Sequence, residues 1–302
     1  MSQQYNQQEL LKGIVLAVLA TIIWSGNFVV ARGVIHEIPP VSLAFFRWTT
    51  GTLILAPFAL KHSIEQKELN KEHWKYLLIV SIFGITVYNT LIYVAGRYLP
   101  AVNLALIGTT SSPIMSIILA GIFLKEKLTK LRVVGIVICI IGILYLLSRG
   151  SWERLMGFHF SLGDAWILAA AFTFAVYNVM VRKKPATIHP LNFLFITFLI
   201  GTLLLAPAFV IEHQYAAPIK WSWSLAGVIL YLGAGNSVLS FLFWNASISK
   251  LGAGRTALFG NLIPIFSSIE AVLFLGESIQ AVHWISGILV IGGLIIANIR
   301  KP

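Results

Sequence analysis

Two ionisable side chains, Arg47 and Glu270, lie inside long apolar segments, where an unpaired charge is costly. Such residues usually face a cavity or a partner, and they serve substrate binding or proton relay. For Arg47 we expect a carboxylate anchor or a gate near the outer side, or else a long stem that snorkels to the headgroups. For Glu270 we expect proton coupling or substrate contact, because a buried carboxyl group must be protonated, paired or hydrated. A solvated place at the membrane edge is the alternative for Glu270.

A larger set of amide and aromatic side chains lies in the same apolar segments. Buried amides need hydrogen-bond partners, and the water or solute in a transport cavity could supply them. For any single residue, an interhelical hydrogen bond worth about 0.6 kcal/mol is the alternative. Together with Arg47, the candidate substrate-binding residues are Trp24, Asn27, Tyr88, Tyr93, Asn103, Tyr177, Asn178, Trp244, Asn245 and Asn261.

Pro113 and Pro264 are expected to kink two of the apolar helices. Proline removes a backbone hydrogen bond, and membrane helices tolerate this loss where a neighbour satisfies the freed carbonyl. Paired kinks would widen the centre of a helix bundle. A packing kink without any role in movement is the alternative.

The composition favours a membrane protein without a cofactor. Apolar residues make up 58% of the chain and charged residues 11%, whereas soluble domains average about 25% charged residues. The net charge of +11 comes from Lys and Arg in short connections, so it predicts no nucleic-acid partner. The sequence has no Walker loop and no metal motif, and its one cysteine, Cys139, cannot form a metal cluster.

Ten segments are apolar and long enough to cross a bilayer, which takes about 20 residues. The connections between them are short, so no separate soluble domain is expected. The segment around 61–75 is the longest connection and is interpreted as a solvated amphipathic turn. The ten predicted spans are 13–31, 41–60, 76–95, 102–124, 133–148, 163–181, 190–211, 224–247, 256–275 and 283–299.

The chain contains an internal repeat of about 150 residues. The sequence GTLILAP from Gly51 recurs as GTLLLAP from Gly201, and the pair Pro113 and Glu126 recurs as Pro264 and Glu277. Each half, 1–150 and 151–302, holds five predicted spans. Two directly joined halves with an odd number of spans must have opposite orientations in the membrane, as in alternating-access transporters.

The distribution of basic residues predicts the orientation of the chain. If the N-terminus is cytoplasmic, sixteen Lys and Arg residues fall on the cytoplasmic side and five on the other. Cytoplasmic connections of membrane proteins carry this excess of positive charge. We therefore expect both termini in the cytoplasm. The two copies of the repeat show the same bias, because KLTKLR follows Glu126 and SIQAVH follows Glu277.

These features together resemble the EamA family of the drug/metabolite transporter superfamily. The matching motifs are WSGNF from Trp24, Phe46-Arg47, and the two stretches that run from Pro113 to Glu126 and from Pro264 to Glu277. The resemblance covers the whole chain. It implies an exporter or permease of the inner membrane for small metabolites such as amino acids or aromatic compounds. It also implies a central cavity lined by helices 1, 3, 4, 6, 8 and 9.

The sequence thus predicts an all-α integral membrane transporter with ten transmembrane helices in two inverted five-helix repeats. Its partners would be a small-molecule substrate and the lipid bilayer. Glycines of the predicted helices 5 and 10 suit close packing, which leaves a homodimer open. The alternative functions are a non-transporting membrane scaffold and an integral membrane enzyme. The sequence leaves substrate identity, transport direction and proton coupling open.

Overall fold

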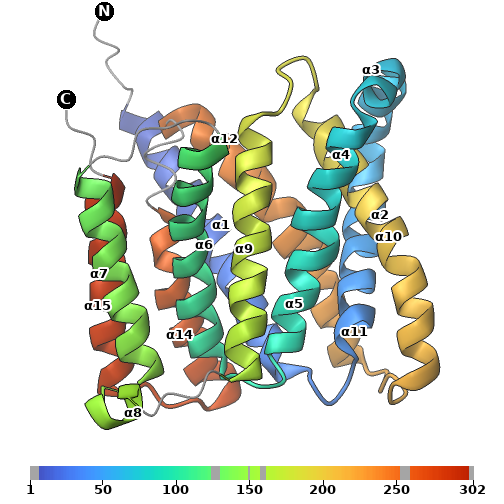
Figure 1. Ribbon diagram of the computed structural model, residues 1–302. Coiled ribbons are helices and arrows are strands. Elements are labelled where there is room, and N and C mark those ends of the chain that lie inside the picture. Colours follow the sequence, from blue (N-terminus) through green and yellow to red (C-terminus); the bar gives the residue numbers. More distant parts are fainter. Residues whose placement is uncertain (1–6, 124–129, 149, 157–160, 252–258, 299–302) are drawn as a thin grey trace, which may run out of the picture.

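The computed structural model describes residues 7–123, 130–148, 150–156, 161–251 and 259–298, and these residues form a bundle of helices without a strand (Figure 1). This confirms the all-α prediction. Glu126 lies outside the described residues. The long helices are α1 (Gln7–Gly33), α2 (Pro40–Glu65), α6 (Ala101–Phe123), α7 (Lys130–Leu147), α9 (Leu162–Arg182), α10 (Pro190–Tyr215) and α15 (Ala281–Asn298).

Three further helices are assembled from consecutive segments. The first consists of α4 (Trp74–Ser81), η1 (Ile82–Val87) and α5 (Tyr88–Ala95). The second consists of α11 (Trp223–Leu230), η2 (Tyr231–Leu239) and α12 (Ser240–Leu251). The third consists of η3 (Gly260–Leu262) and α14 (Ile263–Leu275). Short helices α3 (Lys67–Glu72) and α8 (Trp152–Met156) lie in connections, the first of them within the predicted turn at 61–75.

Within the described residues, each predicted span overlaps one of these helices. In the part of the chain that the structure describes, seven helices are long and apolar enough to cross a membrane. The apolar portions of α7, α14 and α15 are shorter, at 10–17 residues. The chain is therefore a helical membrane protein with several apolar helices.

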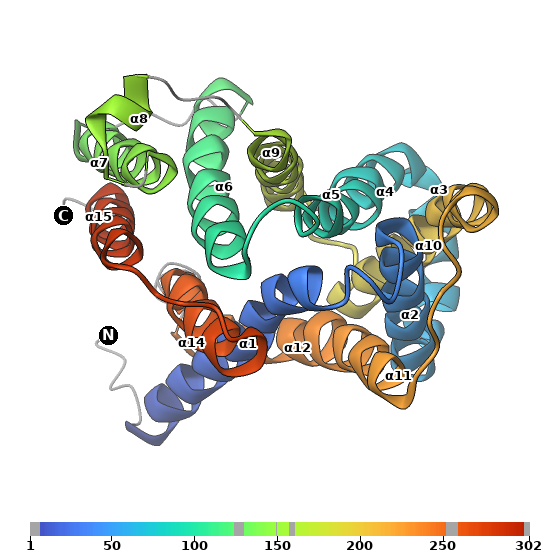
Figure 2. The ribbon, with the colours of Figure 1, turned by 90° about the horizontal axis from the view of Figure 1, so that it is seen from below.

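Helices at equivalent positions of the two halves run in opposite directions. In Figure 1, α1 descends from the upper side whereas α9 rises to it, and α2 rises whereas α10 descends. The described chain also begins and ends on the same, upper side, where α1 starts and α15 ends (Figure 1). Helices α2 and α10 pack against each other, as do α7 and α15 at one edge of the bundle (Figure 2).

Both π-helical segments occur at equivalent places in the two halves. Residues 82–87 form η1, and the equivalent residues, 150 positions later, lie within η2. A π-helical segment holds an extra residue in its turn and is frequent at functional sites. Each segment interrupts a helix that borders the cavity described below.

The N-termini of two helices are capped by carboxylates that are distant in the sequence. Glu212 at the end of α10 accepts from the backbone N–H groups of Val41 and Ser42 at 3.0 and 2.6 Å, at the start of α2. Glu277, just beyond α14, accepts from those of Ala101 and Val102 at 2.8 and 3.2 Å, at the start of α6. A negative charge is favourable at a helix N-terminus. Glu277 therefore pairs with the free amides at the start of α6.

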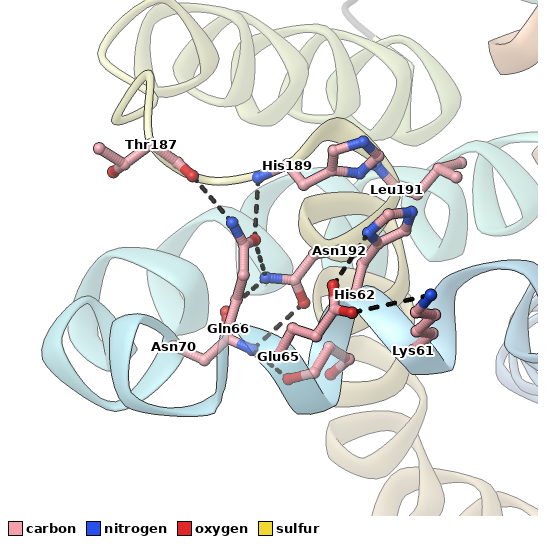
Figure 3. A network of polar contacts seen from close by, with 10 residues as sticks. Lys61, His62, Glu65, Gln66, Asn70, Thr187, His189, Leu191 and Asn192 are labelled. Atoms are coloured by element: carbon pink, nitrogen blue, oxygen red, sulfur yellow. Dashed lines mark hydrogen bonds and ion pairs between the residues drawn. The ribbon is translucent and has the colours of Figure 1, made fainter.

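The upper ends of α2 and α10 are joined by a network of side chains (Figure 3). The Oε1 atom of Gln66 accepts from the backbone N–H of His189 at 2.9 Å and from Asn192 at 2.8 Å. Asn192 also exchanges amide hydrogen bonds with Asn70. The rings of His62 and His189 stack with centroids 3.9 Å apart. The start of α10 is thus held by residues that follow α2, while the start of α2 is held by α10.

Glycines allow two close contacts between helices. A Cβ at Gly96 would lie 2.0 Å from the carbonyl oxygen of Ala31, so only glycine lets the end of α5 approach α1 this closely. A Cβ at Gly201 would lie 2.2 Å from the Cγ2 atom of Ile85, which packs the centre of α10 on η1. Real Cβ contacts are not this short, so a larger residue at either position would separate the helices.

Candidate substrate cavity and its arginine network

A cavity of about 700 Å³ lies between the helices of both halves. Its walls come from α1, α2, η1, α5, α6, α9, α10, η2, α12 and the start of the η3–α14 helix. Arg47 is the eighth residue of α2, near its lower end, and is buried, so it marks the deep end of the cavity. Lys184 follows α9 and Pro190 begins α10, where both helices reach the upper side (Figure 1). The cavity therefore extends from inside the bundle to the side on which α1 starts and α15 ends. Its volume falls in the range of about 300–1,000 Å³ that is usual for small-molecule sites.

Aromatic side chains form much of the cavity wall. Tyr88 stacks on Phe174 with ring centroids 4.4 Å apart, and Phe174 stacks on Tyr177 at 5.5 Å. On the opposite wall, Trp24 contacts Trp244 at 5.0 Å and Phe241 at 5.5 Å. Rings at these separations pack favourably. They present flat apolar faces with few polar groups to a solute.

The absence of a side chain at Gly84 leaves room for the ring of Tyr177 in this wall. A Cβ at position 84 would lie 2.2 Å from the Cδ2 atom of Tyr177. The ring of Tyr177 therefore packs directly on the backbone of η1. The sequence does not show this contact, because the two residues are 93 positions apart in different halves.

Arg47 is the centre of a hydrogen-bond network at the deep end of the cavity. One of its terminal nitrogens, Nη1, donates to Asn27 Oδ1 at 2.6 Å, to Asn89 Oδ1 at 2.9 Å and to the Tyr93 hydroxyl at 2.9 Å. The Nε and Nη2 atoms donate to Ser237 at 3.0 Å and to Asn236 Oδ1 at 2.7 Å. The network thereby joins α1, α2 and α5 to η2 of the other half.

The side chain of Arg47 does not snorkel to the membrane surface. Only 3% of the residue is exposed, and its guanidinium is held by five partners inside the bundle. All five acceptors are uncharged oxygens. Among the described residues, no carboxylate forms an ion pair with Arg47.

Lys184 brings a second positive charge to the cavity. It follows the end of α9, and its ammonium group donates to the carbonyl oxygens of Pro185 and Ile188 at 3.2 and 2.7 Å. Partial burial lowers the pKa of Lys184 below the usual lysine value, because desolvation disfavours the charged form. The neighbouring Lys183 is exposed and does not line the cavity.

Glu270 lies on the other side of α1 from Arg47. Its Oε1 atom accepts from the hydroxyl of Ser25 at 2.8 Å, and its Oε2 atom is buried without a partner among the described residues. Ser25 and Asn27 are two residues apart in α1, which places them about 200° apart around the helix. Glu270 does not line the cavity.

The structure brings most of the predicted substrate-binding residues together. Tyr93 lies behind the cavity wall as a partner of Arg47, and Asn103 lines a separate hollow of about 270 Å³ together with Glu277. Asn261 is in η3, but its side chain is outside the described part of the structure. The predicted residues that line the cavity are Trp24, Asn27, Arg47, Tyr88, Tyr177, Asn178, Trp244 and Asn245.

The two predicted kink residues lie in different settings. Pro113 is in the interior of α6, and its side chain is outside the described part of the structure. Pro264 is the second residue of α14 and follows the 3₁₀ turn η3. Proline fits the first turn of a helix, where its missing N–H needs no partner. At Pro264, therefore, the irregular backbone precedes the proline.

Several residues of the site are missing from the predicted set. Asn89, Asn236 and Ser237 carry the Arg47 network, and Lys184, Phe174 and Phe241 line the cavity. The amides and Ser237 lie in the same apolar segments as the predicted residues, which is a usable signal. Lys184 looks like one of three basic residues in a connection, and nothing in its local sequence separates it from Lys183.

The sequence model of the EamA-like transporter family matches residues 11–148 and 161–299. The chain belongs to the EamA-like transporter family. Its membership confirms the resemblance seen in the sequence motifs, and it gives the cavity a context in small-molecule transport across a membrane. In the described residues, no group of three or more His, Cys, Asp or Glu side chains is placed to hold a metal ion.

Relatives of this EamA-like chain match it over nearly the full length. The "Uncharacterized transporter YyaM" of Bacillus subtilis is 30% identical over 293 residues, which cover 96% of this chain and 95% of the relative. A "Probable amino-acid metabolite efflux pump" of Salmonella typhimurium is 24% identical and covers 93% of both chains. A protein with a solved crystal structure superposes with a TM-score of 0.64 at 20% identity and covers 96% of both chains, which shows a shared fold.

Proposed function

We propose that this EamA-like protein exports small amphipathic metabolites, such as amino acids or aromatic compounds, across the inner membrane. The cavity that reaches from Arg47 to Lys184 is the observation that carries this proposal. Its aromatic walls would hold an apolar body, and the arginine network would hold a polar end. A non-transporting scaffold would have no need of such a cavity at the interface of the two halves.

Alternating access between two inverted five-helix repeats is the proposed mechanism, with 1–150 and 151–302 as the repeats. The opposite directions of equivalent helices (Figure 1), the paired π-helical segments and the two separate family matches support it. The excess of Lys and Arg in the connections on one side supports a cytoplasmic location of both termini. In this orientation the cavity faces the cytoplasm, and the Arg47 network closes the route to the outside.

Proton coupling through Glu270 is the second part of the proposal. Glu270 is a carboxylate in an apolar helix, and it has one hydroxyl partner and no cation partner among the described residues. Intramembrane carboxylates of this kind mark proton relays in transporters. Because Glu270 and Asn27 lie on opposite faces of α1, protonation at Glu270 could change how α1 packs on α14 without occupying the cavity.

The test is flux through purified protein in proteoliposomes. Radiolabelled amino acids, aromatic metabolites, nucleosides, sugars and drugs are supplied with and without an imposed pH gradient, and protein-free liposomes are the control. We expect flux of one class of solute and its loss in the Asn27→Ala and Tyr177→Ala variants. Folded protein that moves none of these solutes would contradict the transport function.

The Glu270→Gln variant tests the coupling separately. We expect it to keep solute binding but to lose transport against a gradient and the response to pH. The Ser267→Ala variant is a matched control, because Ser267 lies three residues away on the same helix and has no described hydrogen-bond partner. Concentrative, pH-dependent transport by Glu270→Gln would rule out Glu270 as the proton carrier.

A further inference from the structure

The charged groups of the cavity are all of one sign. Among the described residues that line it, Arg47 and Lys184 are basic and none is acidic. They lie at its two ends, so a solute inside is exposed to positive charge from both. The other lining residues are uncharged: they are aromatic, aliphatic, amide, hydroxyl or glycine. The excess of positive charge favours a solute that carries negative charge.

Arg47 lacks the counter-charge that a buried guanidinium usually has. Buried charges are normally paired, because removing an ion from water costs several kcal/mol. The five oxygens around Arg47 accept from its Nε, Nη1 and Nη2 atoms but carry no net charge. One N–H of the Nη2 atom also has no partner among the described residues. A ligand that brings a negative charge would therefore gain more here than a neutral one.

Glu270 does not supply this counter-charge. It bonds to Ser25, which lies on the opposite face of α1 from the Asn27 side chain that contacts Arg47. Glu212 and Glu277 are also engaged, because each accepts from two backbone N–H groups at a helix start on the side away from the cavity mouth.

The deep end of the cavity is also unfavourable for an ammonium group. The side-chain oxygens of Asn27, Asn89 and Asn236 could accept from an ammonium, but all three accept from Arg47. An amino group beside them would face the like charge of the guanidinium. Like charges at this range repel more strongly in a partly buried site than in bulk water.

We infer that the cavity selects solutes that bear a carboxylate and a net negative charge, with the carboxylate at Arg47 and the apolar body against the aromatic wall. This inference rests on the transport function proposed above and narrows its substrate class. Lys184 at the mouth attracts the anion, and Arg47 at the deep end holds it. The α-amino group of an amino acid contributes no binding in this arrangement and weakens it.

Four probes that share one phenyl ring and a short alkyl chain test the inference. They are 3-phenylpropionate, L-phenylalanine, 3-phenylpropylamine and 3-phenyl-1-propanol, which are anionic, zwitterionic, cationic and neutral at neutral pH. Binding to the full-length protein in detergent is measured by isothermal titration calorimetry. We expect 3-phenylpropionate to bind at least tenfold more tightly than phenylalanine, because both carry the carboxylate and only phenylalanine brings an ammonium group near the guanidinium. We expect the amine to bind most weakly. Equal or tighter binding of phenylalanine or the amine would overturn the inference.

Two variants test the assigned positions. Asn89→Asp keeps the size of the side chain and puts a carboxylate 2.9 Å from the Arg47 nitrogen, so we expect it to weaken 3-phenylpropionate at least tenfold and the neutral alcohol by less than twofold. Lys184→Gln should weaken the anion severalfold, whereas Lys183→Gln, which changes an exposed neighbour, should not. If both variants bind 3-phenylpropionate as the original protein does, neither Arg47 nor Lys184 selects the anion.

The result is separable from that of the transport function. Flux of a zwitterion or cation in the proteoliposome panel, without binding of 3-phenylpropionate, overturns the anion selectivity and leaves the transport function intact. Absence of both binding and flux in folded protein overturns both. Binding and flux of the anion support both.

Discussion

Arg47 has hydrogen-bond partners in three helical segments, α1, α5 and η2. The free energy of this arrangement depends on the charge of the ligand in the cavity. Five neutral oxygens hold the guanidinium in place. The network therefore both closes the bundle beneath the cavity and presents an uncompensated positive charge to it. A ligand that satisfies this charge would weaken the bonds that keep α1 and α5 against η2.

Removal of Arg47 should expose this double role. We expect Arg47→Met to lower the free energy of unfolding by about 2–4 kcal/mol, because three amide oxygens and two hydroxyl groups lose a charged donor inside the bundle. The measurement is the unfolding midpoint in detergent. Asn245→Ala is the control, since Asn245 lines the same cavity but is exposed. Equal midpoints for the two variants would show that the network contributes little to stability.

Lys184 predicts a dependence of binding on pH. Burial holds the pKa of Lys184 below its ordinary value of 10.5, and a lysine attracts an anion only while it is protonated. As the pH rises from neutral, Lys184 loses its proton before an exposed lysine would. We therefore expect the affinity for 3-phenylpropionate to fall before pH 10.5 is reached, and Lys184→Gln to lack this fall. Titration calorimetry across the pH range measures it, and an unchanged pH profile in Lys184→Gln would contradict the assignment.

At the scale of single helices, backbone contacts and end groups determine the packing. Gly201 lets α10 lie on η1, and Gly96 lets α5 lie on α1. Glu212 and Glu277 satisfy the free amides at the starts of α2 and α6. Each contact joins elements that are distant in the sequence.

A Gly201→Ala substitution should destabilise the α10–η1 contact. Its Cβ would lie 2.2 Å from Ile85, and overpacking of this kind costs about 1–3 kcal/mol. Gly287 lies in α15 with no atom within 4 Å of its Cβ position, so Gly287→Ala should be neutral or stabilising by up to about 1 kcal/mol. Thermal unfolding in detergent compares the two. A lower midpoint for Gly287→Ala than for Gly201→Ala would refute this account.

A Glu212→Ala substitution should destabilise the start of α2. It removes three hydrogen bonds, to the backbone of Val41 and Ser42 and to the Ser42 hydroxyl, and loss of a helix cap costs about 1–2 kcal/mol. Glu68→Ala, on the exposed helix α3, is the control. Hydrogen exchange of the α2 amides should increase in the first variant and stay constant in the second.

The helices themselves were predictable, whereas their contacts were not. Long apolar runs between charged connections predicted the ten helical ranges, because a single segment in lipid can satisfy its backbone hydrogen bonds only as a helix. Arg47 and Glu270 could be recognised as candidate site residues because they are charged residues inside apolar segments. Their hydrogen-bond partners could not be predicted, since Asn236 and Ser25 each belong to the other half and contact them only in the folded protein. The capping role of Glu277 depends likewise on α6, 175 residues away.

At the scale of the whole molecule, the two halves enclose one cavity that neither forms alone. Arg47, Asn27 and Tyr88 come from the first half, and Tyr177, Asn236 and Lys184 from the second. The cavity reaches the side on which α1 starts and α15 ends (Figure 1). Which membrane face this side meets can be measured directly.

Labelling of single cysteines should locate the two faces. In a Cys139→Ala background, Glu68→Cys on α3 and Ser278→Cys beyond α14 place one exposed thiol on each side of the bundle. We expect an impermeant maleimide to label Ser278→Cys in intact cells and Glu68→Cys only in inverted vesicles. The opposite pattern would place the termini outside and would turn the cavity away from the cytoplasm.

The crossed capping of α2 and α10 has a consequence for biosynthesis. The ribosome synthesises α2 before Glu212. Until Glu212 has been made, the backbone amides of Val41 and Ser42 lack the carboxylate that accepts from them in the folded protein. When α10 is made, Gln66 is already present to receive its first amides. The first half therefore reaches its final packing only after the end of α10, with Glu212, has been made. A ribosome stalled before residue 212 should leave a protease-sensitive first half.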